Sequence, residues 1–197
     1  MIISLLLFAI LAAVTGMLVV GGLWRSTLMF FNVLTAATLA TAWSSPLAAV
    51  LEEQMEDYAT LVDFLSIWLI FCGVLALLRE LTDRISPTSL VFPPLVERIG
   101  GGLMAFLTGW IMIAFTAATL HTAPVTRDDV QPTPEARMFF GLAPDRKWLG
   151  WVRGSSLTGP FSRGRNLVFD KEADFILRYA DRRLKLEGEE GLRTAEN

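Results

Sequence analysis

The stretch that decides the fold is Glu97–Leu120, "ERIGGGLMAFLTGWIMIAFTAATL", in which three consecutive glycines lead into an apolar run. From Leu103 to Leu120 no residue is charged. That length approaches the roughly twenty residues that cross a hydrocarbon core, so we predict a membrane-spanning helix over residues 103–120. Glycines before such a helix can bind a phosphate, loosen a linker or let two helices touch, and the rest of the chain favours the third use.

Three further apolar segments precede this one, at residues 2–22, 27–50 and 61–78. None has the polar stripe of a surface helix in a soluble protein. The first segment also lacks a basic n-region and is longer than the apolar region of a signal peptide. We therefore predict an all-α, polytopic membrane protein with four spans in a small bundle, surrounded by the lipid bilayer.

Small residues recur along one face of the fourth predicted span. Gly101, Ala105 and Gly109 are spaced at i, i+4 and i+8, which places them on the same side of a helix. Helices in a bilayer associate through close backbone contact, and small residues permit that contact. The stripe predicts a helix-packing face, used within a compact bundle, in a homo-oligomer or against other membrane proteins.

The other glycine patterns do not indicate a nucleotide site. Gly100 and Gly102 form a fragment of G-x-G without a preceding strand, and the segment 21–27, "GGLWRST", lacks the lysine of a phosphate loop. The net charge of -3 is too small to predict a nucleic-acid partner, and no basic cluster stands beside a span to indicate capture of anionic lipid. We expect no nucleotide, no cofactor and no nucleic-acid partner.

Charges in the loops predict the orientation of the spans. The first and third connections contain the only basic residues before His121, whereas the second contains acids and no base. The positive-inside rule then places both termini on the outer, periplasmic side. The residues concerned are Arg25, Arg79, Arg84 and Arg98 in the basic connections, and Glu52, Glu53, Glu56 and Asp57 in the acidic one.

Several of these features occur together in one known family. Gly22 is followed closely by Arg25, the third apolar segment ends in "LALLREL", and the pair Glu97-Arg98 precedes the glycines. In this combination the chain resembles the colicin V production (CvpA) family over residues 1–120. In that family an acidic residue and an arginine precede glycines that are four residues apart.

The match to the family pattern has departures. Gly101 and Gly109 correspond to two family glycines, and Ala105 replaces a third. Ser26 stands where a glycine is usual, Thr108 replaces a basic residue, and the first span lacks an early acidic residue. The resemblance implies an inner-membrane protein connected with colicin V production and envelope physiology, and it implies no catalytic residues.

The tail after His121 has a different composition, because thirteen of the 17 lysines and arginines lie there. We expect residues 121–166 to form an irregular, proline-containing linker with aromatic side chains such as Trp148 and Trp151. The segment 170–187 has acids at its start and bases at its end, which predicts a helix with one apolar face. This face is expected to pack on the tail's own aromatic residues, with a membrane surface or a partner as the alternative.

The residues of the tail do not suggest an enzyme. His121 is the only histidine, and Ser155 and Ser156 have no base near them in the sequence. One histidine and one cysteine, Cys72, the latter inside a predicted span, cannot complete a zinc site. We therefore expect no catalytic residue and no bound metal.

Three functions remain open from the residues. The first is a non-enzymatic bundle that acts through helix faces in toxin export or envelope maintenance. The second is a small transporter or channel, for which Asp63 and Asn32 are the polar residues within predicted spans. The third is a membrane anchor whose tail docks a partner protein.

Overall fold

The computed structural model describes residues 2–53, 59–88, 90–125, 130–131, 133–158 and 168–187, and over these residues its regular structure is helical. Four helices are long and apolar enough to cross a membrane, as predicted. This confirms the predicted all-α fold with four candidate spans. The helices are α1 (Ile2–Val19), α2 (Gly22–Glu52), α3 (Ala59–Ile85), α4 (Pro94–Leu120), α6 (Pro144–Thr158) and α7 (Phe175–Glu187).

Helix α4 begins nine residues earlier than the apolar run predicts. Pro94 is at the start of the helix, where no backbone N–H is needed for an intrahelical hydrogen bond and where the fixed φ of proline suits a helix. The negative charge of Glu97 in the first turn interacts favourably with the positive end of the helix dipole. The three glycines therefore lie inside α4 and do not precede it. Helix α3 similarly continues past its apolar run to Ile85.

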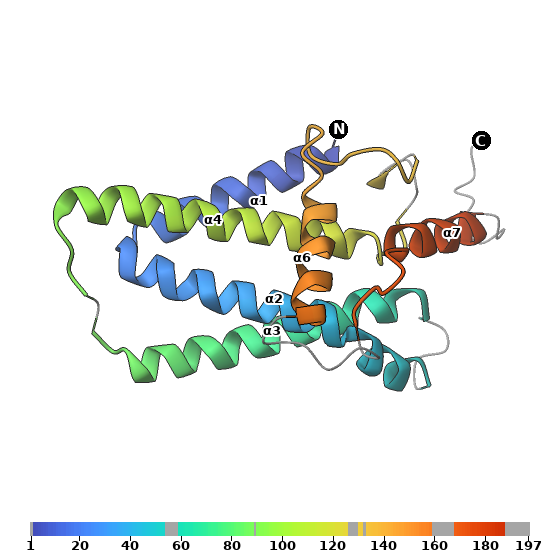
Figure 1. The fold of residues 1–197 in the computed structure, drawn as a ribbon, viewed down its shortest axis with the longest axis horizontal. Helices are drawn as coiled ribbons and strands as arrows, with labels where there is room; N and C mark the ends of the chain where they lie inside the picture. Colours follow the sequence, from blue (N-terminus) through green and yellow to red (C-terminus); the bar gives the residue numbers. More distant parts are fainter. Residues whose placement is uncertain are drawn as a thin grey trace, which may run out of the picture.

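The four long helices are arranged in a row in the order α1, α4, α2, α3 (Figure 1). Helix α1 packs along α4, α4 along α2, and α2 along α3. Helix α3 meets α4 where the rings of Trp68 and Phe71 pack against Phe115. The two inner helices contribute many small buried residues, among them Ala36, Ala37, Ala40, Ala114 and Ala117. Within the part of the chain that the structure describes, the outer helices α1 and α3 expose large apolar side chains on the faces turned away from the row.

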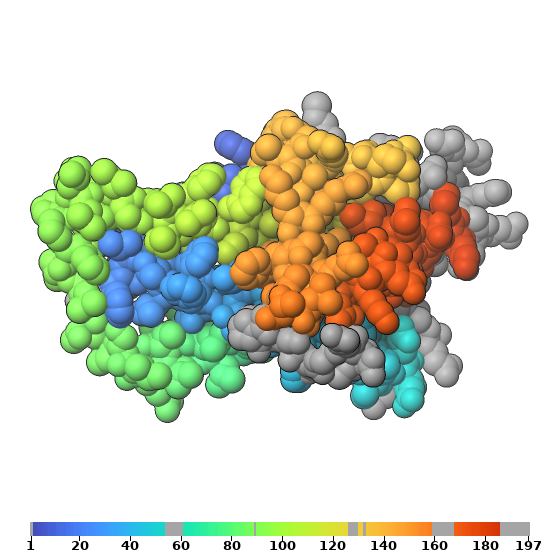
Figure 2. Space-filling view, in the orientation of Figure 1, coloured from blue at the N-terminus to red at the C-terminus, as the bar shows by residue number. Residues whose placement is uncertain are grey.

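The tail contains a helix, α6, within the segment that was predicted to be an irregular linker. Helix α6 crosses α4 and α2 on the face seen in Figures 1 and 2, and buries Trp148, Leu149 and Val152 against them. The expected irregular linker is therefore wrong over residues 144–158, while residues 159–166 lie outside the described part of the chain. Pro144, Gly150 and Gly154 are residues typical of turns and loops, and for this reason the sequence did not predict a helix here.

Helix α7 starts at Phe175, five residues after its predicted start. Asp170 caps it from outside, because its Oδ1 accepts hydrogen bonds from the backbone N–H groups of Asp174 (2.9 Å) and Phe175 (3.1 Å). Phe169 and Ile176 pack with residues of α6, and so the tail forms one core with the membrane helices.

Candidate functional site: a helix junction and a buried polar cluster

The first site is the corner between α1 and α2, where α4 begins. Gly22 has φ +78°, a conformation that L side chains rarely adopt, and it turns the chain from α1 into α2. The Oε1 atom of Glu97 accepts a hydrogen bond of 2.9 Å from the backbone N–H of Leu23. A β-carbon on Gly22 would lie 2.1 Å from this oxygen. The family residues Gly22 and Glu97 are therefore in direct contact.

The carboxylate of Glu97 caps the N-terminus of α2, for which the N-cap residue Gly21 has no side chain. Gly21, at the start of α2, has no side chain to accept a hydrogen bond from the first free N–H groups. A carboxylate at this position satisfies one such N–H and lies at the positive end of the helix dipole. The second oxygen, Oε2, is buried and has no hydrogen-bond partner among the described residues.

The predicted packing stripe of α4 faces α1 and this corner. A β-carbon on Gly101 would lie 3.1 Å from the backbone nitrogen of Leu23, and one on Gly109 would lie 3.2 Å from the backbone oxygen of Leu11. Ala105, between them, is fully buried. These small residues are thus occupied by contacts within the chain.

The two arginines of the family pattern do not join the junction. Arg25 and Arg98 are both exposed, although their neighbours Gly22 and Glu97 meet. Arg25 lines a groove of about 590 Å³ between the α1–α2 corner and the end of α3. Within this groove Asn32 donates a hydrogen bond of 3.0 Å from Nδ2 to the Thr82 hydroxyl.

The other predicted polar residue, Asp63, lies near the start of α3, whereas the partner of Asn32, Thr82, lies near its end. The carboxylate of Asp63 forms an ion pair with Arg182 of α7, which fastens the tail to the start of α3. Tyr179 lies beside this pair, and burial, followed by the negative charge of Asp63, raises the pKa of its phenol. Asp63 and Asn32 therefore occupy separate sites.

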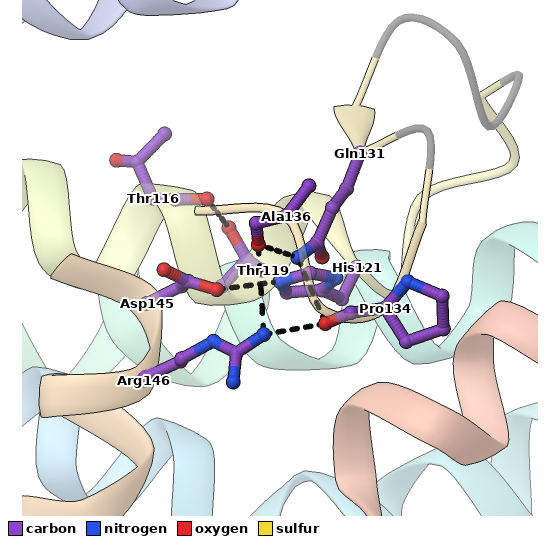
Figure 3. A network of polar contacts seen from close by, with 8 residues as sticks. All are labelled: Thr116, Thr119, His121, Gln131, Pro134, Ala136, Asp145 and Arg146. Atoms are coloured by element: carbon purple, nitrogen blue, oxygen red, sulfur yellow. Dashed lines mark hydrogen bonds and ion pairs between the residues drawn. The ribbon is translucent and has the colours of Figure 1, made fainter. Parts of the chain in front are cut away.

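The second candidate site is a buried polar cluster between the end of α4 and the start of α6 (Figure 3). His121 Nε2 and Asp145 Oδ2 are 3.0 Å apart, and both side chains are almost completely inaccessible. Beside them, Gln131 and Arg146 donate hydrogen bonds to the backbone carbonyls of Pro134 and Ala136. The cluster joins α4, α6 and the intervening chain.

No sequence pattern predicts Asp145 as the partner of His121. The two residues are 24 positions apart and no local spacing links them. Among the described residues no hydroxyl or thiol is hydrogen-bonded to His121, and the Ser155 and Ser156 hydroxyls donate to the carbonyls of Val152 and Arg153. Within the same residues no group of three potential metal ligands occurs. The cluster is suited to holding α6 on α4.

These helices and polar contacts define a polytopic helical membrane protein. The family model for the Colicin V production protein matches residues 3–165, and the chain belongs to this family. The match continues beyond the predicted range of 1–120 and includes α6. No curated protein and no solved structure matches the chain.

Proposed function

We propose that this chain is a non-enzymatic membrane protein that acts in colicin V production or export, or in maintenance of the cell envelope, through contacts between helix faces. Membership of the family supports the connection with colicin V. The observation that carries the proposal is the helix row, in which the outer helices α1 and α3 leave large apolar side chains exposed among the described residues. Their outer faces expose Phe8, Met17, Leu69 and Leu77 to lipid, to a second copy or to another membrane protein.

The proposed location is the inner membrane, with both termini on the periplasmic side. The basic residues around the α3–α4 connection, Arg79, Arg84 and Arg98, and the acidic residues from Glu52 onward at the end of α2 support this orientation. Gly154→Cys in a Cys72→Ala background provides a test, because a β-carbon at Gly154 meets no atom within 4 Å. A membrane-impermeant maleimide is expected to label intact cells, whereas labelling only after lysis would reverse the orientation.

Deletion of the gene in a strain that makes colicin V tests the functional proposal. We expect lower release of the toxin or higher permeability of the envelope, and restoration by the intact chain. The variants His121→Gln and Ser155→Ala test the proposal that the protein is not an enzyme. Both are expected to restore function when they reach wild-type abundance. A deletion without either phenotype would contradict the proposed role, and loss of function in an abundant Ser155→Ala protein would indicate catalysis.

A small transporter is the second candidate, and the groove beside Asn32 favours it. This groove of about 590 Å³ combines polar residues of α2 and α3 with the apolar side chains of Met17 and Leu28. Purified protein in vesicles is expected to pass no solute if the first proposal holds. Flux that Asn32→Leu abolishes would favour the transporter.

A further inference from the structure

Helix α6 lies across the membrane helices at a defined level. The indole Nε1 of Trp148 donates to the Thr41 hydroxyl (3.1 Å), and that of Trp151 donates to the Thr38 hydroxyl (3.3 Å). On α4, the ring of Phe115 lies 6.0 Å from that of Trp148. Figure 1 shows α6 running across α4 and α2.

Helix lengths relate this level to the thickness of a bilayer. Helix α1 has 18 residues, or about 27 Å, close to the ~30 Å of a hydrocarbon core. The distance along α2 from Gly22 to Thr41 is about 29 Å by the same rise per residue. Helix α2 has 31 residues, so roughly 16 Å of it continues beyond the level of α6.

The two long edges of α6 differ in chemistry. On one edge, Trp151 is half-exposed and reaches Thr38, which is nearer than Thr41 to the α1–α2 corner. The ammonium group of Lys147 lies 5.6 Å from the centre of the Trp110 ring. On the other edge, Arg146 and Arg153 line a groove of about 400 Å³ against α7.

The part of the molecule beyond α6 is rich in charge. Between α2, α3 and α7 lies a groove of about 560 Å³, lined by charged residues of all three helices. The Asp63–Arg182 ion pair lies in the same region. Charges in hydrocarbon are costly, and water is the favourable environment for this groove. Its charged residues are Glu52, Asp63, Arg178, Asp181, Arg182 and Lys185.

We propose that α6 lies in the headgroup layer of the bilayer, with its Trp151 edge toward the hydrocarbon and Lys147 bound to the phosphate of an anionic phospholipid. The ends of α2 and α3 beyond α6, and all of α7, then stand in water as an extramembrane unit. Tryptophan is enriched at membrane interfaces, and the half-exposed ring of Trp151 lies at this level while its N–H is bonded to Thr38. Lysine near an anionic surface adds Coulomb attraction to phosphate.

Nitroxide labels on single cysteines test the membrane boundary in full-length protein reconstituted into vesicles of phosphatidylcholine and phosphatidylglycerol. Ala49→Cys lies beyond α6 on α2, and Phe31→Cys lies before it; both positions are exposed, and Cys72→Ala is the background. The label at position 49 is expected to collide mainly with a water-soluble nickel chelate, as a label in water does. The label at position 31 is expected to collide mainly with oxygen, which concentrates in the hydrocarbon. An oxygen-dominated result at both positions would overturn the proposal.

A fluorescent label on Ser155→Cys tests the lipid contact through quenching by brominated phosphatidylglycerol or phosphatidylcholine. Preferential quenching by the anionic lipid is expected, and Lys147→Gln should reduce the preference by up to about fivefold, the equivalent of ~1 kcal/mol per lysine. Lys171→Gln, another exposed lysine of the tail, is the matched control and should leave it unchanged. Equal quenching by both lipids in the wild-type protein would overturn the phosphate contact.

Discussion

Glu97 of α4 and Leu23 of α2 are joined by a hydrogen bond of 2.9 Å across 74 positions of the sequence. The bond closes the corner at Gly22, where the chain passes from α1 into α2. Gly101 lies one turn further along α4 and contacts the same corner. The junction therefore fixes how the α1–α2 pair is placed on α4.

Removing the Glu97 carboxylate should destabilise this junction. Glu97→Ala leaves the Leu23 N–H without its acceptor and is expected to lower the free energy of unfolding by about 1–3 kcal/mol. Glu97→Gln keeps an amide oxygen and should cost less. Circular dichroism during unfolding in detergent measures the difference, with exposed Arg98→Ala as the control. Equal losses for the glutamine and alanine variants would contradict the hydrogen bond.

Two adjacent glycines of α4 provide a matched comparison. At Gly101 a β-carbon would be 3.1–3.2 Å from backbone atoms of Leu23 and Gly22, which cannot move aside easily, whereas at Gly102 it meets nothing within 4 Å. Gly101→Ala is expected to destabilise the protein by about 1–3 kcal/mol. Gly102→Ala should be neutral or stabilise by up to about 1 kcal/mol through helix propensity. The same unfolding measurement compares the stability of the two variants. Equal changes in stability would contradict the assignment of Gly101 to the packing face.

The sequence could predict the four spans because an apolar run is a local pattern. Apolar runs indicated four helices, and the spacing of Gly101 and Gly109 indicated a helix face. The pairing of Glu97 with Leu23, and of His121 with Asp145, depends on tertiary structure that no local spacing encodes. The start of α4 was missed for another reason, since an apolar run does not contain the Pro94 start signal.

Neutralising Asp63 should loosen α7. Asp63→Asn removes the charge that faces Arg182 and Tyr179, and the amides of α7 are expected to exchange hydrogen faster. The pKa of Tyr179 should fall but stay above its ordinary value of 10.0, because burial is the larger cause of its elevation. Spectrophotometric titration in a Tyr58→Phe background measures this pKa. Exposed Asp181→Asn is the control, and unchanged exchange in Asp63→Asn would contradict the contact.

The start of α7 should depend on pH through Asp170. Burial is the main cause that raises the pKa of this carboxyl group above its ordinary value of 3.8. The folded state therefore binds the proton more tightly than the unfolded state. The resulting stabilisation is complete below pH 3.8 and is lost as the pH rises through the elevated pKa. Hydrogen exchange of the α7 amides should become faster as the pH rises through this range, after correction for the intrinsic pH dependence of exchange. Asp170→Asn should remove this change, and an unchanged pH profile in the variant would show that another group causes it.

The most direct test of the account replaces Gly101 or Gly102 by leucine and asks which variant restores toxin release and envelope integrity in a deletion strain. Both variants add the same side chain to the same helix, but only Gly101 contacts the α1–α2 corner. We expect Gly102→Leu to restore function and Gly101→Leu, inserted in the membrane at equal abundance, to fail to do so. Full restoration by Gly101→Leu would contradict the claim that function depends on this packed helix face.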